Sequence, residues 1–323
     1  MQLQLSSDEM TIEKGGEKYL KYIKITNRTP KTIKYYEGCL RSFSSYLQYK
    51  KEISNDEREP TNVLCSDVNE DMILDYIEYL QDIRKISDIT VNSYLRGLRA
   101  LFYWFAKKGY CKKIMFQLIK QDEPMKETFT NEELDRLLKK PKITKENFVE
   151  YRTWVMTSFF LATGSRISAV LNLKLENIDL KEDDIYLYNT KKRKYQIIPI
   201  TTKLHNILSE YISIRGQQET DYLFCNQFGY QLRLRSAEDC IKDYNLARGV
   251  TKSSAHLYRH TFAKIWVLND RDLFTLQKML GHTTLDMVKK YVQLFGPDLK
   301  IKNNQFNPLD MFVTNNEKIQ LNL

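Results

Sequence analysis

Apolar residues recur at steps of three and four through most of the first 110 residues, and this spacing confines that part of the chain to helices. The clearest stripe consists of Ile33, Tyr36, Leu40, Phe43 and Leu47. Such stripes predict four helices, over residues 7–24, 30–49, 69–82 and 90–108. We therefore expect a compact all-α bundle in a domain spanning residues 1–116, with residues 50–66 as a polar loop.

Two local signals bound these predicted helices. Thr29 followed by Pro30 is a favourable N-cap and first-turn pair, so the second helix should begin there. Gly109 follows the fourth stripe and is a natural residue after a helix C-terminus.

The rest of the chain mixes helical and strand patterns. Residues 117–129 have the composition of an interdomain linker, and Thr130 with Glu133 forms a capping box that begins a helix. Helices are also predicted over residues 149–162, 166–173, 202–213 and 234–247. Short strands are predicted over residues 177–180, 185–188 and 195–200. The expected fold is therefore mainly α with a small β-sheet, in a second domain over residues 130–323.

Composition narrows the class of partner and the compartment. The chain of 323 residues carries a net charge of +9, which favours a polyanionic partner such as nucleic acid. Its five cysteines are widely spaced and include no CxxC pair, so neither a zinc site nor a disulfide framework is expected, and a reducing cytoplasm fits. No run of about 18 apolar residues occurs, and the N-terminus lacks a signal-peptide pattern, so no membrane association is expected.

Chemistry-bearing residues concentrate between residues 256 and 291. His256 and Arg259 are three residues apart, so on one helix they share a face. Leu280-Gly281-His282 is interpreted as opening another helix, and Tyr291 lies nine residues after His282. Nine helical residues rise about 13 Å, so His282 and Tyr291 meet only if this segment bends or breaks. Cations, imidazoles and a phenol suit a site that holds a phosphodiester and attacks it.

A metal site is the alternative explanation for two of these histidines. His256 and His260 have i, i+4 spacing, but Leu257 stands where the zincin pattern requires glutamate. We therefore expect no metal and no cofactor, and we interpret His260 as a buried structural residue.

An arginine in the middle of the chain adds a further cation. Gly164 permits a tight turn after the apolar helix, and Arg166 then stands at the start of the next predicted helix. A guanidinium there would face an anion together with free backbone N–H groups.

These motifs together resemble the tyrosine recombinase (phage-integrase) family. The resemblance rests on Thr-Gly-Ser-Arg at 163–166, the basic turn at 190–194, His-Leu-Tyr-Arg-His-Thr-Phe-Ala from residue 256, and Leu-Gly-His with a tyrosine nine residues on. It covers roughly residues 10–300 and is specific in the second half. Two positions depart from the family pattern: Ala169 stands where an acidic residue is usual, and Ala255 stands where proline is frequent.

The resemblance implies a role for each site residue. Tyr291 would be the nucleophile, and Arg166 and Arg259 would hold the non-bridging phosphate oxygens. His256 would act in proton transfer, and His282 would hydrogen-bond the phosphate.

The general acid is assigned by the same resemblance. In the family, a hairpin lysine lies eight residues before a proline, and Pro199 places it at Lys191. Lys192 and Lys194 are the competing candidates for protonating the leaving 5′ oxygen.

The implied protein is a two-domain DNA clamp acting as a site-specific recombinase or integrase through a 3′-phosphotyrosine intermediate. Its partners would be double-stranded recombination sites, with a homotetramer in the synapse and a monomer off DNA; whether accessory proteins take part stays open. Two other functions stay open at this point: a type IB topoisomerase-like relaxing enzyme and a non-catalytic DNA-binding regulator. The tail after residue 306 would dock either in cis or on a neighbouring subunit.

Overall fold

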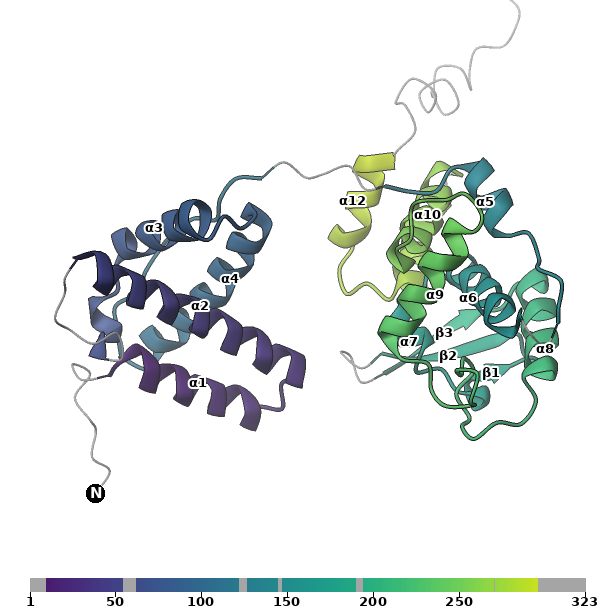
Figure 1. Ribbon diagram of the computed structural model, residues 1–323, viewed down its shortest axis with the longest axis horizontal. Helices are drawn as coiled ribbons and strands as arrows, with labels where there is room; N and C mark the ends of the chain where they lie inside the picture. The colour runs from purple at the N-terminus through teal and green to yellow at the C-terminus, as the bar shows by residue number, and fades with distance from the viewer. Residues whose placement is uncertain are drawn as a thin grey trace, which may run out of the picture. The chain divides into compact units, whose positions relative to one another are not determined.

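The computed structural model describes residues 10–54, 62–121, 127–144, 147–189, 194–269 and 271–295. By its internal contacts the chain divides into two units, Met1–Glu123 and Pro124–Leu323 (Figure 1).

The N-terminal unit is a helical bundle. Its helices are α1 (Ile12–Ile25), α2 (Pro30–Ser54), α3 (Glu70–Glu78) and α4 (Asp88–Lys107), with a short 3₁₀ turn at Cys65–Asp67. The predicted stripe faces inward: Phe43 and Leu47 of α2 pack in one core with Leu98 and Phe102 of α4. The four predicted helices are therefore confirmed, and α2 begins at Pro30 as its cap signal indicated.

Three bounds in this unit differ from those expected. Helix α1, predicted from residue 7, begins at Ile12 with Thr11 as its N-cap. Helix α2 continues to Ser54, so residues 50–54, expected in a loop, are helical. The third predicted helix ends in a π-helical turn, Tyr79–Ile83, because its last residues pack Tyr79 and Leu80 into the core.

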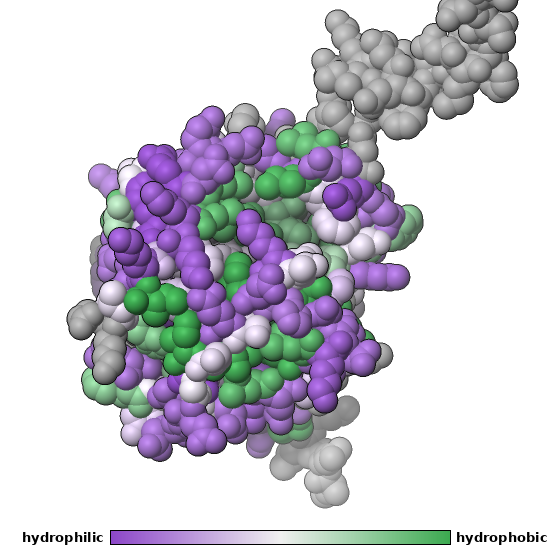
Figure 2. Space-filling model, turned by 90° about the vertical axis from the view of Figure 1, so that its right-hand side faces the viewer, coloured by the Kyte–Doolittle hydropathy of each residue, from purple (hydrophilic) through white to green (hydrophobic). Residues whose placement is uncertain are grey.

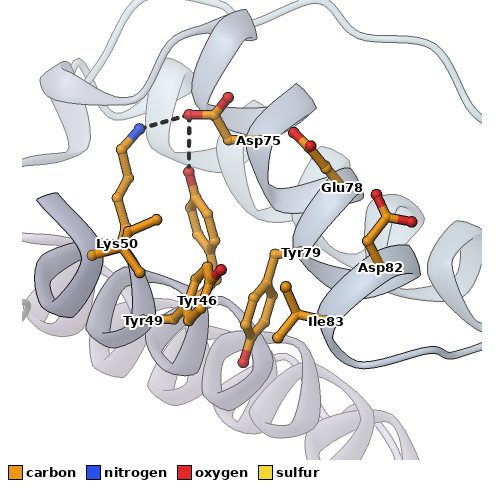
Figure 3. A pocket seen from close by; sticks show the side chains of 9 residues that line it. Tyr46, Tyr49, Lys50, Asp75, Glu78, Tyr79, Asp82 and Ile83 are labelled. Carbon is orange, nitrogen blue, oxygen red and sulfur yellow. Dashed lines mark hydrogen bonds and ion pairs between the residues drawn. The ribbon is translucent and has the colours of Figure 1, made fainter.

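A surface pocket of about 310 Å³ lies between α2 and the α3 to π-helix segment (Figure 3). Lys50 Nζ forms an ion pair of 2.7 Å with the Asp75 carboxylate, and the Tyr46 hydroxyl lies 3.5 Å from the same group. Glu78 and Asp82 also line this pocket, so its acidic lining makes it unsuited to hold a phosphate.

The segment expected as a linker packs partly on the units it joins. The Asn92 side chain bonds the backbone N–H and carbonyl of Ile119, both at 2.9 Å, so this stretch is held by the N-terminal unit. On the other side, the Phe129 backbone N–H donates to Thr261 at 2.9 Å within the C-terminal unit.

The C-terminal unit is built around α6 (Phe148–Thr163), as Figure 1 shows. Residues on every side of this helix are buried, from Tyr151 to Phe160 without a break, which is typical of a buried central helix. It packs against α8 (Thr202–Arg215), α9 (Leu234–Leu246) and α10 (Ala255–Leu268). Helix α5 (Asn131–Leu137) begins at the predicted capping box, where Thr130 and Glu133 bond each other's backbone N–H.

The small β-sheet has three antiparallel strands in the order β1-β2-β3. They are β1 (Ile178–Asp179), β2 (Asp184–Asn189) and β3 (Lys194–Pro199). Ile185 pairs with Ile198, and both side chains are buried against the helical core. The fold expected from the sequence, mainly α with a small sheet, is therefore confirmed.

Two predictions for the second half are wrong. The helix expected over residues 166–173 is the single turn α7 (Ile167–Val170), with Arg166 as its N-cap residue. His282 does not open a helix: α11 (Leu273–Leu280) ends before it, Gly281 caps α11 in the left-handed conformation, and α12 (Asp286–Phe295) begins four residues after His282. The chain therefore turns between His282 and α12.

Hydrophilic side chains dominate the face of the C-terminal unit in Figure 2, with hydrophobic patches between them. Within the described ranges, no helix is long and apolar enough to cross a membrane.

Candidate active site

A tight turn after α6 sets the position of Arg166. Gly164 ends α6 with φ of 62°, a conformation that side chains other than glycine's rarely adopt. A Cβ on Gly164 would also come within 2.6 Å of Phe262 and 2.8 Å of Leu280. The turn is reinforced by the Thr163 hydroxyl, which lies 2.9 Å from Ser165 Oγ. Only glycine therefore lets α6 end this close to the elements that follow.

Arg259 of α10 is the buried centre of the candidate site. Only 5% of it is exposed, and its Nη1 donates to the Gly164 carbonyl at 2.7 Å. Its Nη2 donates to the Leu280 carbonyl at 2.8 Å and lies 2.7 Å from His282 Nε2. Burial and the nearby charge of Arg166 lower the pKa of Arg259 to about 10, so it stays protonated at neutral pH.

Arg166 lies beside it. Its Nη1 is 3.5 Å from the same Leu280 carbonyl that binds Arg259. Both arginines line a pocket of about 450 Å³, together with Ser165 and Gly281. Two neighbouring cations repel each other unless an anion lies between them, so the pocket is suited to bind a phosphate.

Tyr291 of α12 points into the same site from the C-terminal side. Its hydroxyl lies 3.0 Å from His260 Nδ1, and its ring is stacked on that of His282 with centroids 6.3 Å apart. The turn between α11 and α12 is what lets His282 and Tyr291 meet. Burial raises the pKa of Tyr291, while the charge and hydrogen bond of Arg259 act in the opposite direction.

His256 lies one turn before Arg259 on α10, where neighbouring atoms cover part of it and the rest stays open to solvent. Loss of surrounding water lowers the pKa of His256, and the charges of Arg259 and Arg166 lower it further. A neutral imidazole at pH 7 follows, which can accept a proton. The site thus gathers Arg166, Arg259, His256, His282 and Tyr291, whereas Lys191, Lys192 and the connection between β2 and β3 lie outside the described residues.

His260 was interpreted from the sequence as a buried structural residue, but it is half-buried and lies against the Tyr291 hydroxyl. Its role was missed because the two residues are 31 positions apart, and no local spacing indicates their contact. Helical spacing from Arg259 alone places it on a neighbouring face of α10.

Gln196 of β3 was also missed. Its amide nitrogen donates to the carbonyls of Lys278 and Met279, each at 2.7 Å, at the end of α11. A single glutamine in a strand pattern carries no sequence signal for such a contact.

In the part of the chain that the structure describes, no group of three His, Cys, Asp or Glu side chains is arranged to bind a metal ion. The five cysteines, all described, are free thiols.

Two family models match the chain. The model described as the phage integrase family covers residues 127–296, and the phage integrase SAM-like domain covers residues 17–122. Among curated proteins, the chain is 25% identical over 302 residues to tyrosine recombinase XerD of Staphylococcus epidermidis, an alignment that spans 90% of this chain and 98% of the relative. XerD of Staphylococcus saprophyticus is 26% identical with the same coverage.

Solved structures share the fold. The XerH recombinase bound to its difH substrate before cleavage superposes with a TM-score of 0.65 and 24% identity, covering 90% of this chain and 82% of that one. The Tn1549 transposon integrase in complex with a circular intermediate DNA gives 0.71 and 17%, covering 94% of this chain and 100% of that one. Since the first family model spans more than half of its residues, the chain belongs to the phage integrase family, the tyrosine recombinases.

Proposed function

We propose that this recombinase cuts DNA at specific sites by attack of Tyr291 on a phosphodiester and rejoins it through a 3′-phosphotyrosine intermediate. The observation that carries the proposal is the meeting of the Tyr291 phenol with His260, His282 and two arginines in one chain. The comparisons support site-specific recombination and give no support to a topoisomerase-like enzyme or a non-catalytic regulator.

The arginines would offset charge on the non-bridging oxygens. A guanidinium has five N–H groups. Arg259 uses three of them in its bonds to Gly164, Leu280 and His282, and the remaining N–H groups face the Tyr291 side of the site, where the attacked phosphate would lie. Because Arg259 is already held by these bonds, it would not have to reorganise when charge develops on phosphorus.

The phenol must lose a proton before or during its attack. Burial raises the pKa of Tyr291, so the site without DNA holds it protonated. His256 would take part in this proton transfer because its lowered pKa keeps it neutral at pH 7. His282 would hydrogen-bond the phosphate, and Lys191 would protonate the leaving 5′ oxygen.

The bond energy is retained in this scheme. Tyr291 forms a bond to phosphorus as the bond to the 5′ oxygen breaks, and the free 5′ hydroxyl later reverses the step on the same or another strand. Religation therefore requires neither ATP nor a further activating group. Because two duplexes must exchange strands, we propose that four protomers assemble in the synapse. The reaction would take place in the cytoplasm, and a reaction with purified protein and DNA would show whether accessory proteins are needed.

Covalent trapping tests the proposal. The protein would be incubated with nicked duplexes made from the sequence flanking its own gene and then denatured. We expect a protein–DNA band that Tyr291→Phe abolishes, while the matched change Tyr230→Phe, at an exposed loop position, retains it. A band that persists in Tyr291→Phe would mean that another tyrosine attacks.

The two other functions give different results in the same system. A relaxing enzyme would form the band but would not join two different duplexes. A regulator would bind the duplexes without forming any band.

A further inference from the structure

Both site arginines share one uncharged acceptor. The Leu280 carbonyl lies 2.8 Å from Arg259 Nη2 and 3.5 Å from Arg166 Nη1. Within the described residues, neither guanidinium forms an ion pair with a carboxylate. Ala169, which lines the same pocket, has no side-chain acceptor to offer. Main-chain carbonyls, together with His282 Nε2 on Arg259, therefore take the place of a carboxylate beside the two arginines, and the Leu280 carbonyl is the acceptor that both of them approach.

The position of the Leu280 carbonyl at the end of a helix explains why it can orient two guanidinium groups. It belongs to the last residue of α11, where backbone carbonyls lack helical partners and carry about half a negative charge in sum. A carboxylate would cancel a full positive charge beside the phosphate. The helix end instead orients both cations and leaves more of their charge available for the phosphate.

A helix end serves as an orienting group only if it is held in place. Gln196 reaches from β3 and donates at 2.7 Å to each of the carbonyls of Lys278 and Met279, the two residues before Leu280. Gly281 caps the helix with φ of 61°, and a Cβ there would collide with the Gln196 amide. The amide therefore packs directly against the turn that leads to His282.

We propose that Gln196 is a positioning residue: it fixes the end of α11 so that the Leu280 carbonyl orients Arg166 and Arg259 for the phosphate. The expected effect on the cleavage rate rests on the proposed function. The expected effect on the end of α11 does not, because it can be measured without cleavage. Gln196 lines the same pocket as the two arginines, but its amide nitrogen is already bonded to the α11 carbonyls, so in this scheme it acts through the arginines.

Single-turnover cleavage of a nicked duplex tests the proposal in the full chain. Gln196→Glu keeps the shape but removes both N–H donors, and it sets a negative charge against the carbonyls. We expect about 10- to 100-fold slower formation of the covalent intermediate, because small displacements of catalytic groups cost rates of this order. Gln217→Ala, in the exposed loop after α8, is the control and should match the original protein.

Modified substrates show through which group Gln196 acts. A methylphosphonate at the cleaved position lacks the charge that the arginines offset. The ratio of the cleavage rates of the original protein and Gln196→Glu, called the rate gap below, should therefore shrink. A 5′-bridging sulfur leaves without protonation, so it bypasses the general acid, and the rate gap should persist. A rate gap that closes on the sulfur substrate instead would overturn the proposal, since Gln196 would then act through the hairpin lysine. A fold defect alone would leave the rate gap equal on all three substrates.

Amide hydrogen exchange tests, without any cleavage, whether Gln196 holds the end of α11 in place. The Gly281 and His282 amides bond the carbonyls of Lys278 and Gln277 at 3.0 Å each. They should exchange faster in Gln196→Glu, while amides of α6 should not change. Unchanged exchange at Gly281 and His282, or equal cleavage by both proteins, would refute the inference. Failure of the original protein to form any adduct would instead refute the proposed function and leave exchange to decide this one.

Discussion

Individual side chains in this site are held by close contacts that permit few replacements. Gly164 combines a left-handed backbone with a Cβ position already filled by Phe262 and Leu280. Its carbonyl also accepts from Arg259, so the turn and the buried cation depend on each other. Changes at these positions should therefore separate stability from catalysis.

We expect Gly164→Ala to lower the free energy of unfolding by about 1–3 kcal/mol, because it adds backbone strain and a collision with α10 and α11. Gly249→Ala is the comparison: its φ is also positive, at 67°, but its Cβ would meet only the end of the Arg136 side chain. Chemical denaturation measures both variants. Equal losses would show that the collision contributes nothing.

Arg259→Ala should reduce the cleavage rate by about 10²–10³, since one charge-stabilising contact is typically worth this much. Arg259→Lys should recover little of it, because an ammonium cannot bond Gly164, Leu280 and His282 from one plane. DNA affinity, measured by gel shift, should change far less than the cleavage rate. A parallel loss of affinity would count against the assigned role.

The lowered pKa of His256 predicts an acid limb in the pH profile of cleavage. The imidazole stays neutral as pH falls to about 6.5, the ordinary value, and the rate should drop only below it. By the same linkage, the unfolded chain binds more protons than the folded one below pH 6.5, so stability should also fall there. His256→Asn should remove the limb. A limb centred above pH 6.5 would contradict the lowered pKa.

Elements in the two units differ in how well the sequence predicts them. The stripe on α2 and its start at Pro30 after the N-cap Thr29 follow from local signals, and the structure confirms both: the Thr29 hydroxyl accepts from the Thr32 N–H at 3.2 Å. The end of α11 carries a local signal, Gly281 directly after Leu280, which the prediction of a helix opening at Leu280 overlooked. The assignment of the site residues by their motifs stays a prediction. The contacts of Leu280 with Arg259, 21 residues away, and of Tyr291 with His260, 31 residues away, have no local signal, because only tertiary packing brings these residues together.

A cap offers a test at this scale. Thr130→Ala removes the hydroxyl that accepts from the Glu133 N–H at the start of α5, so the free energy of unfolding should fall by about 1 kcal/mol. Thr251→Ala, at an exposed position before α10, is the matched control. Thermal or urea unfolding of the two variants compares them. A loss no larger than that of the control would show that the cap is replaceable.

Across the whole molecule, the described site residues all belong to the C-terminal unit. The N-terminal unit supplies a separate core, but its 20 lysines and arginines are nearly balanced by 18 aspartates and glutamates, so most of the net charge of +9 lies in the C-terminal unit. We infer that the C-terminal unit supplies the chemistry and much of the electrostatic attraction to DNA, so binding should weaken as salt rises.

Tyr291 reaches His260 and His282 of its own chain, and this contact has a consequence for mixed populations. Two defective copies, one with Tyr291→Phe and the other with Arg259→Ala, should not complement each other. Each site takes its tyrosine and its arginines from one chain, so neither copy can supply the group that the other lacks. A cell that expresses both should remain as deficient as a cell with either one. If four protomers act in the synapse, as proposed, a single defective copy would stall the exchange after its neighbours have acted, so such alleles should be dominant over the functional gene.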